Sequence, residues 1–395
     1  MIRVGFICDT FELGGQEQGC LEVMRRLDRA KFQPYLFSFR PGSLLPEVQA
    51  LGLPISIGYN KPAFETMWTE QDECARRDYL KRLSDELCAA AIDVCLIYAW
   101  RDGVKAARDA GVGAVVERVA GLGLTSRLRD KSLCHRIICE SKTTRDVILA
   151  QRHLLKCRRE QLVVIPNGVD LNRFNPELYE RSRCRRALGL EQNDFVVCSI
   201  ARLAPEKNHG HLLQALRYLI DNESEAHASD RRKNIRGLIV GPDNGCAHQL
   251  KAEAERLGVT QQVRFLGPRS DIPEILRAAD AFALTSFTEG TPFALLEAMA
   301  MGLPIVATHV GSIIEAIDGN GFLVDVLRPE QTYKALSDLR EDPSLSFRLG
   351  RRSRKLARRF DLDSMMRRYE EVLIEAYESA ATAQAKSYQQ RLASS

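Results

Sequence analysis

The chain has 395 residues, of which 45% are hydrophobic, and 56 basic residues against 52 acidic ones give a formal net charge of +4. This length predicts two domains of ordinary size, each with its own core. The near balance of charge argues against a dedicated nucleic-acid-binding protein, so any anion that the protein binds must be recognised locally.

The eleven cysteines carry no disulfide or metal signature, because they are scattered without CxxC pairs or spaced histidine partners. This pattern predicts reduced, buried thiols and no metal site. The start MIRVGFICDTFELGG is typical of a strand and loop rather than a signal peptide. No run approaches the ~20 apolar residues that span a bilayer. We therefore expect a cytoplasmic protein, able at most to lie at the inner face of the membrane.

Short apolar runs rich in valine and isoleucine recur along the chain, with helical patterns between most of them. Strands that alternate with helices predict parallel sheets with both faces covered. Six runs precede residue 170 and six follow it, so we predict two doubly wound α/β domains. The runs are IRVGFIC, YLFSF, VCLIYA, AVVERV, RIICES and LVVIPNG, then FVVCSIA, GLIVG, VRFLG, AFALTS, PIVAT and FLV.

The predicted division gives an N-terminal domain over residues 1–169 and a C-terminal domain over residues 170–361. The segment 170–194 interrupts the strand rhythm with proline, asparagine and charges, and we expect it to hold the connection and one short helix.

The chain after residue 343 is basic and strongly helical. Asp361 or Asp363 can cap a final amphipathic helix, predicted over residues 362–380. Residues 381–395 are expected to fray.

The first predicted strand is followed by DTFELGGQEQG, in which Gly14 and Gly15 allow a ligand to approach the backbone closely. This loop is not GxGxxG, and no acidic ribose ligand follows ~20 residues later, which argues against a nicotinamide enzyme. The absence of GxxxxGK[ST] excludes a P-loop. A plain flexible turn is the alternative interpretation of the glycine pair.

Two cations follow the first strand of the second half. FVVCSIA continues into ARLAPEKNHGHLLQAL, which places Arg202 just past the strand and Lys207 at the start of the next helix. Together with a helix terminus they can neutralise a diphosphate that leaves with rising charge. Taken singly, Pro-Glu-Lys is a common helix opening and Arg202 could be a surface residue.

The stretch SFTEGTPFALLE combines a strand-to-helix turn with an anion site. Thr291 is expected as the helix N-cap and Pro292 as the first helical residue, and the helix should end near Gly302. The first-turn amides, at Phe293 and Ala294, lack helical partners and carry the positive end of the helix dipole.

Two carboxylates flank this anion site, Glu289 in the loop before it and Glu297 inside the helix. A carboxylate beside an anion site is repulsive unless it meets hydroxyls, which sugars and riboses supply. The arrangement therefore suits a sugar diphosphate, with its phosphate over the helix start, its sugar near Glu289 and its ribose near Glu297. All these groups are expected at one strand-end edge of the sheet. Two solvated glutamates beside an ordinary turn remain the alternative for this segment alone.

Taken together, these stretches resemble the group 1 glycosyltransferases, family 4, which are retaining enzymes with the GT-B fold. The matching stretches span nearly the whole chain: FELGGQEQ, LVVIPNGVDLNRF, ARLAPEKNH, VRFLGPRSDIPEIL and LTSFTEGTPFALLEAMAMGLPIVATHVGSIIEAI. The resemblance implies two Rossmann-like domains facing across a cleft, the first for the acceptor and the second for the nucleotide-sugar donor. It also implies that the C-terminal helix returns to the N-terminal domain.

The resemblance implies that Arg202 and Lys207 hold the donor diphosphate and that Glu289 meets the transferred sugar, so these three are the expected catalytic residues. Glu297 would bind the ribose. The full expected donor site is Arg202, Lys207, Glu289, Gly290, Thr291, Pro292, Phe293, Ala294 and Glu297. No metal and no cofactor is implied beyond the UDP-, GDP- or ADP-linked sugar substrate.

In the N-terminal domain, Gly14 and Gly15 match the family loop that meets the phosphate and the acceptor. Asn167 and Gly168, in the boundary motif, are expected to shape a turn. Many relatives carry a histidine where Ala120 follows GAVVERV, and His135 and His153 are poor replacements. Candidates for acceptor contacts are Trp100, Arg101, Glu117 and Arg118, each of which could equally be a packing or salt-bridge residue.

The implied function is transfer of a hexose-like sugar, with retention and without metal, to a hydroxyl of a glycan or glycolipid in bacterial-type surface polysaccharide or lipopolysaccharide assembly. The alternatives are a non-catalytic GT-B binding or scaffold protein, which Ala120 motivates, and a sugar-nucleotide epimerase. The basic runs RSRCRR, RRKNIR and RRSRKLARR suggest contact with an anionic membrane surface, with solvated faces as the alternative. No nucleic-acid partner is expected.

Overall fold

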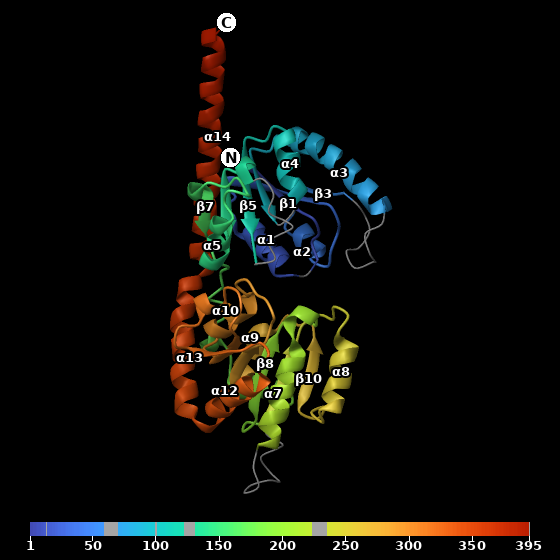
Figure 1. Ribbon diagram of the computed structural model, residues 1–395, viewed down its shortest axis with the longest axis vertical. Coiled ribbons are helices and arrows are strands. Elements are labelled where there is room, and N and C mark those ends of the chain that lie inside the picture. The colour runs from blue at the N-terminus through green and yellow to red at the C-terminus, as the bar shows by residue number, and fades with distance from the viewer. Residues whose placement is uncertain (13, 59–69, 99–100, 122–130, 223–234, 395) are drawn as a thin grey trace. The chain divides into compact units, whose positions relative to one another are not determined.

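The computed structural model describes the chain except residues 13, 59–69, 99–100, 122–130, 223–234 and 395. Its contacts divide it into two compact units, Met1–Pro166 with Ser364–Ser395, and Asn167–Asp363. Each unit is built on a parallel sheet flanked by helices (Figure 1). The predicted fold class of two doubly wound α/β domains is therefore confirmed, whereas the roles assigned to the two halves stay predictions.

The first unit has a seven-stranded sheet in the order β3-β2-β1-β4-β5-β6-β7. Its strands are β1 Ile2–Cys8, β2 Phe32–Ser38, β3 Ile55–Ile57, β4 Val94–Tyr98, β5 Ala114–Val119, β6 Arg136–Cys139 and β7 Leu162–Val164. Its helices are α1 Gly15–Arg26, α2 Leu45–Gln49, α3 Glu70–Ala89, α4 Arg101–Asp109 and α5 Lys142–Ala150, with the 3-10 turns η1 Lys131–Leu133 and η2 Arg159–Gln161. Most of α14, Leu362–Ser394, also belongs to this unit.

The second unit has a six-stranded sheet in the order β10-β9-β8-β11-β12-β13. Its strands are β8 Phe195–Ile200, β9 Ile235–Val240, β10 Val263–Gly267, β11 Ala281–Leu284, β12 Ile305–Thr308 and β13 Gly321–Val324. Its helices are α6 Arg181–Ala187, α7 His209–Asp221, α8 Ala247–Arg256, α9 Ile272–Ala278, α10 Phe293–Ala300, α11 Ile313–Ala316, α12 Pro329–Glu341 and α13 Pro343–Ala357. The 3-10 turns are η3 Pro176–Leu178, η4 Pro205–Lys207 and η6 Arg358–Phe360.

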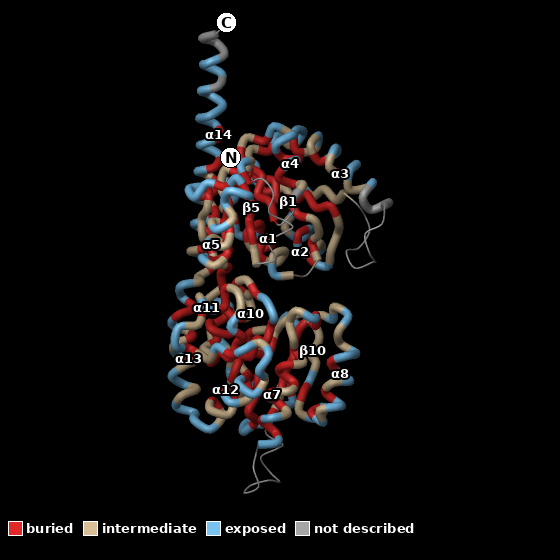
Figure 2. Tube along the Cα trace, viewed as in Figure 1, coloured by how far each residue is buried: buried red, intermediate tan, exposed pale blue. Residues whose placement is uncertain are grey.

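The central strands are buried, as Figure 2 shows. Every residue of β4 and β5 is buried, because helices cover both faces of the sheet. This explains why these strands appear in the sequence as continuous apolar runs. All eleven cysteines are free, and most of them are buried.

One strand, β3, was not predicted from the sequence. It has three half-buried residues between Pro54 and Gly58, and among the described strands it pairs with β2 alone, at the edge of the first sheet. So short a strand carries no periodicity of its own, and its pairing partner defines it.

The C-terminal helix α14 is tied to the first unit by a buried polar network. The Arg118 guanidinium donates from Nε to the Tyr369 hydroxyl at 2.9 Å and lies 3.7 Å from the Glu140 carboxylate. The backbone N–H of Asp28 donates to the Glu370 carboxylate at 3.0 Å. The helix continues to Ser394, and the fraying expected for residues 381–395 stays a prediction. The alanine, glutamine and lysine of this segment are good helix formers, which explains the continuation.

Replacing Tyr369 by phenylalanine should lower the free energy of unfolding of the first unit by about 1–3 kcal/mol, because it removes the acceptor of a buried charged donor. Urea denaturation followed by circular dichroism measures the change. The matched control is Tyr377→Phe, at a partly exposed tyrosine of the same helix, which should change the free energy little. Equal losses in the two variants would contradict the structural role of the Arg118 network.

Each sheet has one point at which the order of its strands reverses. In the second sheet this point lies between β8 and β11, and in the first between β1 and β4. Loops that leave the carboxyl ends of these neighbouring strands lie next to each other, and doubly wound sheets bind ligands there. The fold therefore selects two loop pairs as candidate ligand sites, one in each unit.

Candidate functional site

Lys207 and Glu289 meet at the switch point of the second sheet. Lys207 ends the turn η4 after β8, and Glu289 lies in the loop after β11. The Lys207 Nζ atom is 2.7 Å from the Glu289 Oε1 atom, and the two side chains are 17% and 8% exposed. The structure thus brings these two residues together at one edge of the sheet, although 82 positions separate them in sequence.

The loop that carries Glu289 is held from both sides. The Ser286 hydroxyl donates to Glu289 Oε1 at 2.6 Å, and the Phe287 N–H donates to the Glu206 carbonyl at 2.9 Å. Gly311 has a φ of +53°, and a Cβ atom there would lie 1.8 Å from the Glu289 carbonyl oxygen. Only glycine permits this close approach, so Glu289 has a fixed backbone.

Arg202 lies just after β8, with its guanidinium 3.0 Å from the Glu206 carboxylate. Both side chains are partly exposed, and ion pairs of this kind contribute little, so an anion of higher charge can displace Glu206. The Arg202 carbonyl lies 3.1 Å from the His209 Nε2 atom. Burial lowers the pKa of His209. Because a carbonyl oxygen only accepts, the ring donates from Nε2 to the Arg202 carbonyl and holds the turn between Arg202 and Lys207.

The helix α10 begins one residue later than predicted. Pro292 is its N-cap, with ψ 130°, and Phe293 is its first residue, so the assignment of Thr291 as N-cap is wrong. The Thr291 carbonyl instead accepts a hydrogen bond of 2.6 Å from the Asn167 side chain. The helix ends at Ala300, close to the predicted end.

The amides of the first turn of α10 point out of the helix without helical partners, as at any helix N-terminus. Phe293 and Ala294 are half-buried there, Gly290 lies in the preceding loop, and Glu297 is half-buried more than one turn further on. Glu289 and the start of α10 therefore share the loop after β11, and Lys207 contacts this loop through its ion pair with Glu289. An anion bound at this helix start would meet both backbone donors and a lysine.

The two residues of the boundary motif do more than shape a turn. Asn167 is buried and holds the loop before α10 through its bond to Thr291. Gly168 lies so close to Leu362 that a Cβ atom would be 2.7 Å from the Leu362 Cα atom. Sequence reasoning missed the positioning role of Asn167, Ser286 and His209. For Ser286, the sequence offered one indication, namely that this polar residue stands three positions before Glu289.

In the first unit, Gly14 is the N-cap of α1 and Gly15 its first residue, after the loop that follows β1. Arg101 begins α4, after the neighbouring strand β4. These positions share the switch point of the first sheet. Trp100 lies outside the described residues.

Glu117 and Arg118 lie inside β5, and both are buried. Glu117 forms an ion pair with Lys131, and Arg118 contacts Glu140 and Tyr369. The structure places these two acceptor candidates in buried ion pairs on an inner strand, and a role of either residue in acceptor binding stays a prediction. Ala120 follows the end of β5.

His135 and His153, the two histidines compared with the position of Ala120, do not lie at the end of β5. His135, half-buried, accepts a 3.1 Å hydrogen bond at Nδ1 from the Val115 N–H near the start of β5, and His153 is exposed. Burial, with nearby arginines, lowers the pKa of His135.

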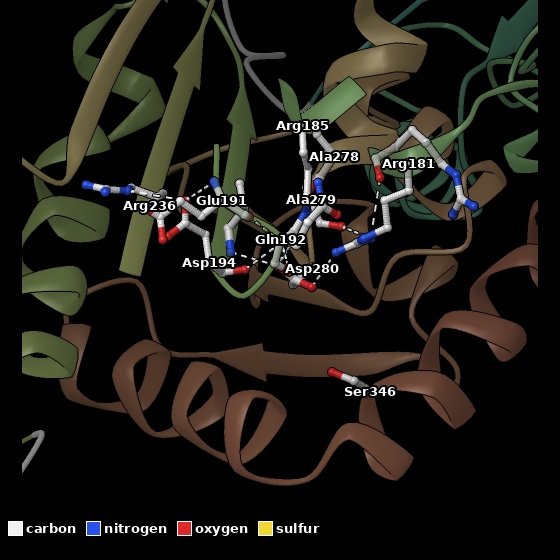
Figure 3. A network of polar contacts seen from close by, with 12 residues as sticks. Arg181, Arg185, Glu191, Gln192, Asp194, Arg236, Ala278, Ala279, Asp280 and Ser346 are labelled. Atoms are coloured by element: carbon white, nitrogen blue, oxygen red, sulfur yellow. Dashed lines mark hydrogen bonds and ion pairs between the residues drawn. The ribbon is translucent and has the colours of Figure 1, made fainter. Parts of the chain in front are cut away.

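Arginines of all three basic runs make internal contacts; in RRKNIR, the Arg236 guanidinium lies 3.5 Å from the Asp194 carboxylate. In RSRCRR, Arg181 and Arg185 bind Asp280, as Figure 3 shows. In RRSRKLARR, Arg354 donates to the carbonyls of Phe174 and Ala300, both at 2.7 Å, and Arg352 pairs with Asp318. Most of RRKNIR lies outside the described residues.

Within the described part of the chain, no group of three or more His, Cys, Asp or Glu side chains is placed to hold a metal ion. No helix in that part has the length and apolar character needed to cross a bilayer.

Comparison with known proteins connects this geometry to a family. The model "Glycosyl transferases group 1" matches residues 180–356, and the model "Glycosyltransferase Family 4" matches residues 13–173. A curated relative from Escherichia coli, UDP-Gal:alpha-D-GlcNAc-diphosphoundecaprenol alpha-1,3-galactosyltransferase, is 32% identical over 62% of this chain and 64% of its own length. D-inositol 3-phosphate glycosyltransferase from Salinispora arenicola is 35% identical over 56% of this chain and 50% of its own length.

The matches to these two relatives thus span about half to two thirds of the relatives' length. Among solved structures, HepE from Anabaena in complex with UDP-glucose has a TM-score of 0.76 at 22% identity, covering 95% of this chain and 100% of its own. WaaG, a glycosyltransferase involved in lipopolysaccharide biosynthesis, has a TM-score of 0.74 at 17% identity, covering 94% and 99%. At these identities the two structures support the fold alone.

Proposed function

Because the chain belongs to the group 1 glycosyltransferases and has their GT-B fold, we propose that it transfers a hexose-like sugar from a nucleotide-diphosphate sugar to a hydroxyl of a glycan or glycolipid. The observation that carries the proposal is the Lys207–Glu289 pair at the switch point of the second sheet, beside the start of α10. A cation, a carboxylate and helix amides at one edge suit a ligand that combines a diphosphate with hydroxyls.

In the proposed reaction, Lys207 stabilises the departing diphosphate. A lysine has three N–H donors, and the bond to Glu289 uses one of them, so the others can meet phosphate oxygens. Arg202 and the first-turn amides of α10 add further donors. Charge on the leaving diphosphate rises in the transition state, so these groups bind the transition state better than the donor.

We propose that the transfer proceeds with retention and without metal. The bond between the anomeric carbon and the phosphate oxygen breaks, and the acceptor oxygen bonds to the same face of the sugar. The acceptor proton passes to the leaving phosphate, so no protein nucleophile is needed. This path leaves Ala120, at the position where many relatives carry histidine, compatible with activity.

The name of the E. coli relative supports a narrower proposal for the substrates. That protein is named for a UDP-galactose donor and a diphosphoundecaprenol-linked acceptor. We propose by analogy a UDP-linked hexose and a lipid-linked acceptor here, in surface polysaccharide or lipopolysaccharide assembly at the inner face of the membrane. The internal contacts of Arg181, Arg185 and Arg354 remove part of the basic surface first expected to meet lipid.

A thermal-shift experiment tests the donor site. We expect one of UDP, GDP and ADP, with its sugars, to stabilise the protein, by about 2.7 kcal/mol at a hundred times the dissociation constant. The shift should be lost in Arg202→Ala and in Glu297→Ala. Arg217→Ala, which removes an exposed arginine of α7 paired with Asp221, is the matched control and should keep the shift.

Two other results would change the proposed function. No shift with any nucleotide at millimolar concentration would favour a non-catalytic scaffold. Turnover of the nucleotide sugar to an epimer without acceptor would favour an epimerase.

A further inference from the structure

We propose that Ser286 is a positioning residue that determines which oxygen of Glu289 meets the donor sugar. The inference rests on the proposed function, because it concerns the sugar that Glu289 is proposed to contact. In the structure, the two oxygens of the Glu289 carboxylate differ in their hydrogen bonds.

Both contacts to the Glu289 carboxylate fall on the same oxygen. Lys207 Nζ lies 2.7 Å and Ser286 Oγ lies 2.6 Å from Oε1. A carboxylate oxygen has about two lone-pair directions, so these two donors saturate Oε1. No described residue donates a hydrogen bond to Oε2, which is therefore the oxygen left for a ligand hydroxyl.

Ser286 can act in this way because it is itself fixed. The residue is 0% exposed, and its carbonyl accepts a 2.7 Å hydrogen bond from the Thr308 hydroxyl, at the end of the neighbouring strand β12. Ser286 thus lies in the loop that connects β11 to α10, and the bond from Thr308 fixes this loop to the end of β12. Lysine alone holds a carboxylate loosely, because an ammonium group binds as a point charge, whereas the serine adds a directed bond.

Two consequences follow for the donor. Glu289 accepts a lysine and a serine hydrogen bond as an ionised carboxylate, so its Oε2 atom accepts and does not donate. A sugar hydroxyl that contacts Oε2 must therefore be the hydrogen-bond donor. Loss of Ser286 should leave nucleotide binding intact, because the nucleotide contacts lie elsewhere, while it weakens recognition of that one hydroxyl.

The test compares UDP with UDP-hexoses for the wild type, Ser286→Ala and Ser286→Thr. We expect Ser286→Ala to bind UDP within about twofold of the wild type and to lose about tenfold in kcat/KM for the UDP-hexose, as for a hydrogen bond to a charged group. Ser286→Thr keeps the hydroxyl and should retain most of the wild-type preference for UDP-hexose over UDP. Each variant is compared with itself, as the ratio of its value for UDP-hexose to its value for UDP. Partial unfolding of a variant affects both values equally and therefore leaves this ratio unchanged.

A series of monodeoxy UDP-hexoses sharpens the test. With the analogue that lacks the contacted hydroxyl, the wild type and Ser286→Ala should become nearly equal, whereas the tenfold difference should persist with the other analogues. The matched control is Ser337→Ala, which removes a 2.7 Å serine-to-carboxylate bond, to Glu341, on α12. It should leave every ratio unchanged.

The outcomes separate this inference from the proposed function. If the wild type binds nucleotide sugar but Ser286→Ala loses UDP and UDP-hexose binding equally, or shows the same loss with every deoxy analogue, Ser286 is only structural and the inference is overturned. If the wild type binds no UDP, GDP or ADP compound, the proposed function and this inference fall together.

Discussion

Replacing Lys207 by methionine should lower kcat/KM for sugar transfer by about 10²–10³-fold, the usual cost of removing one donor that stabilises developing negative charge. The Lys207 side chain is only partly exposed, at the edge where β8 and β11 end. Water therefore does not readily take the place of the lost ammonium group beside the diphosphate. The effect should appear mainly in kcat, because the charge on the diphosphate rises as it departs.

Lys207→Met also leaves the Glu289 carboxylate, 8% exposed, without its cation. The double variant Lys207→Met/Glu289→Gln removes both charges and should recover stability in a thermal melt but no activity. Lys355→Met, at an exposed lysine of α13, is the matched control and should transfer sugar at the wild-type rate. If the double variant regains activity, Lys207 serves only to balance Glu289 and its catalytic role is refuted.

Asp280→Ala should lower the free energy of unfolding of the second unit by about 3–5 kcal/mol, because it leaves buried arginine charge without its carboxylate. Asp280 accepts from Arg181 at 2.5 Å, from Arg185 at 2.6 Å and from the Val196 N–H at 2.8 Å. Arg185 is buried and also donates to four carbonyls, of Ala278, Glu191, Gln192 and Asp194 (Figure 3). One carboxylate thus secures α6, the turn before β8 and the start of β11.

Urea unfolding, followed separately for the two units, measures this loss. The control is Asp318→Ala, which removes an exposed partner of Arg352 on the surface of the same unit and should cost less than about 1 kcal/mol. The unfolding of the first unit should be unchanged by either substitution. A loss for Asp280→Ala no larger than that for Asp318→Ala would show that Arg185 is stabilised by its carbonyl partners alone.

Much of the fold follows from local patterns. Every apolar run predicted as a strand contains one in the structure, since a strand buried on both faces needs a continuous apolar segment. β3 escaped because its three residues acquire strand geometry only by pairing with β2. The start of α10 was misplaced by one residue because Asn167, far away in sequence, binds the Thr291 carbonyl.

The candidate site was predictable in part for a related reason. Arg202, Lys207 and Glu289 follow strand-like runs, and loops at the carboxyl ends of parallel strands share one edge. Glu117 and Arg118 also stand in a strand-like run, yet they are buried in ion pairs with Lys131 and Glu140. A charged residue in a strand can face a ligand or an internal partner, and sequence spacing does not distinguish the two.

The sequence by itself determined the element types, the two-domain division into doubly wound halves and the loops that could hold a sugar diphosphate. Only the tertiary structure decided which charged groups pair, such as Lys207 with Glu289 across 82 positions and Arg118 with Tyr369 across 251. The physical reason is that apolar periodicity is a local property of the chain. The partner of a polar group depends instead on strand order and on burial, which arise only when distant segments pack together.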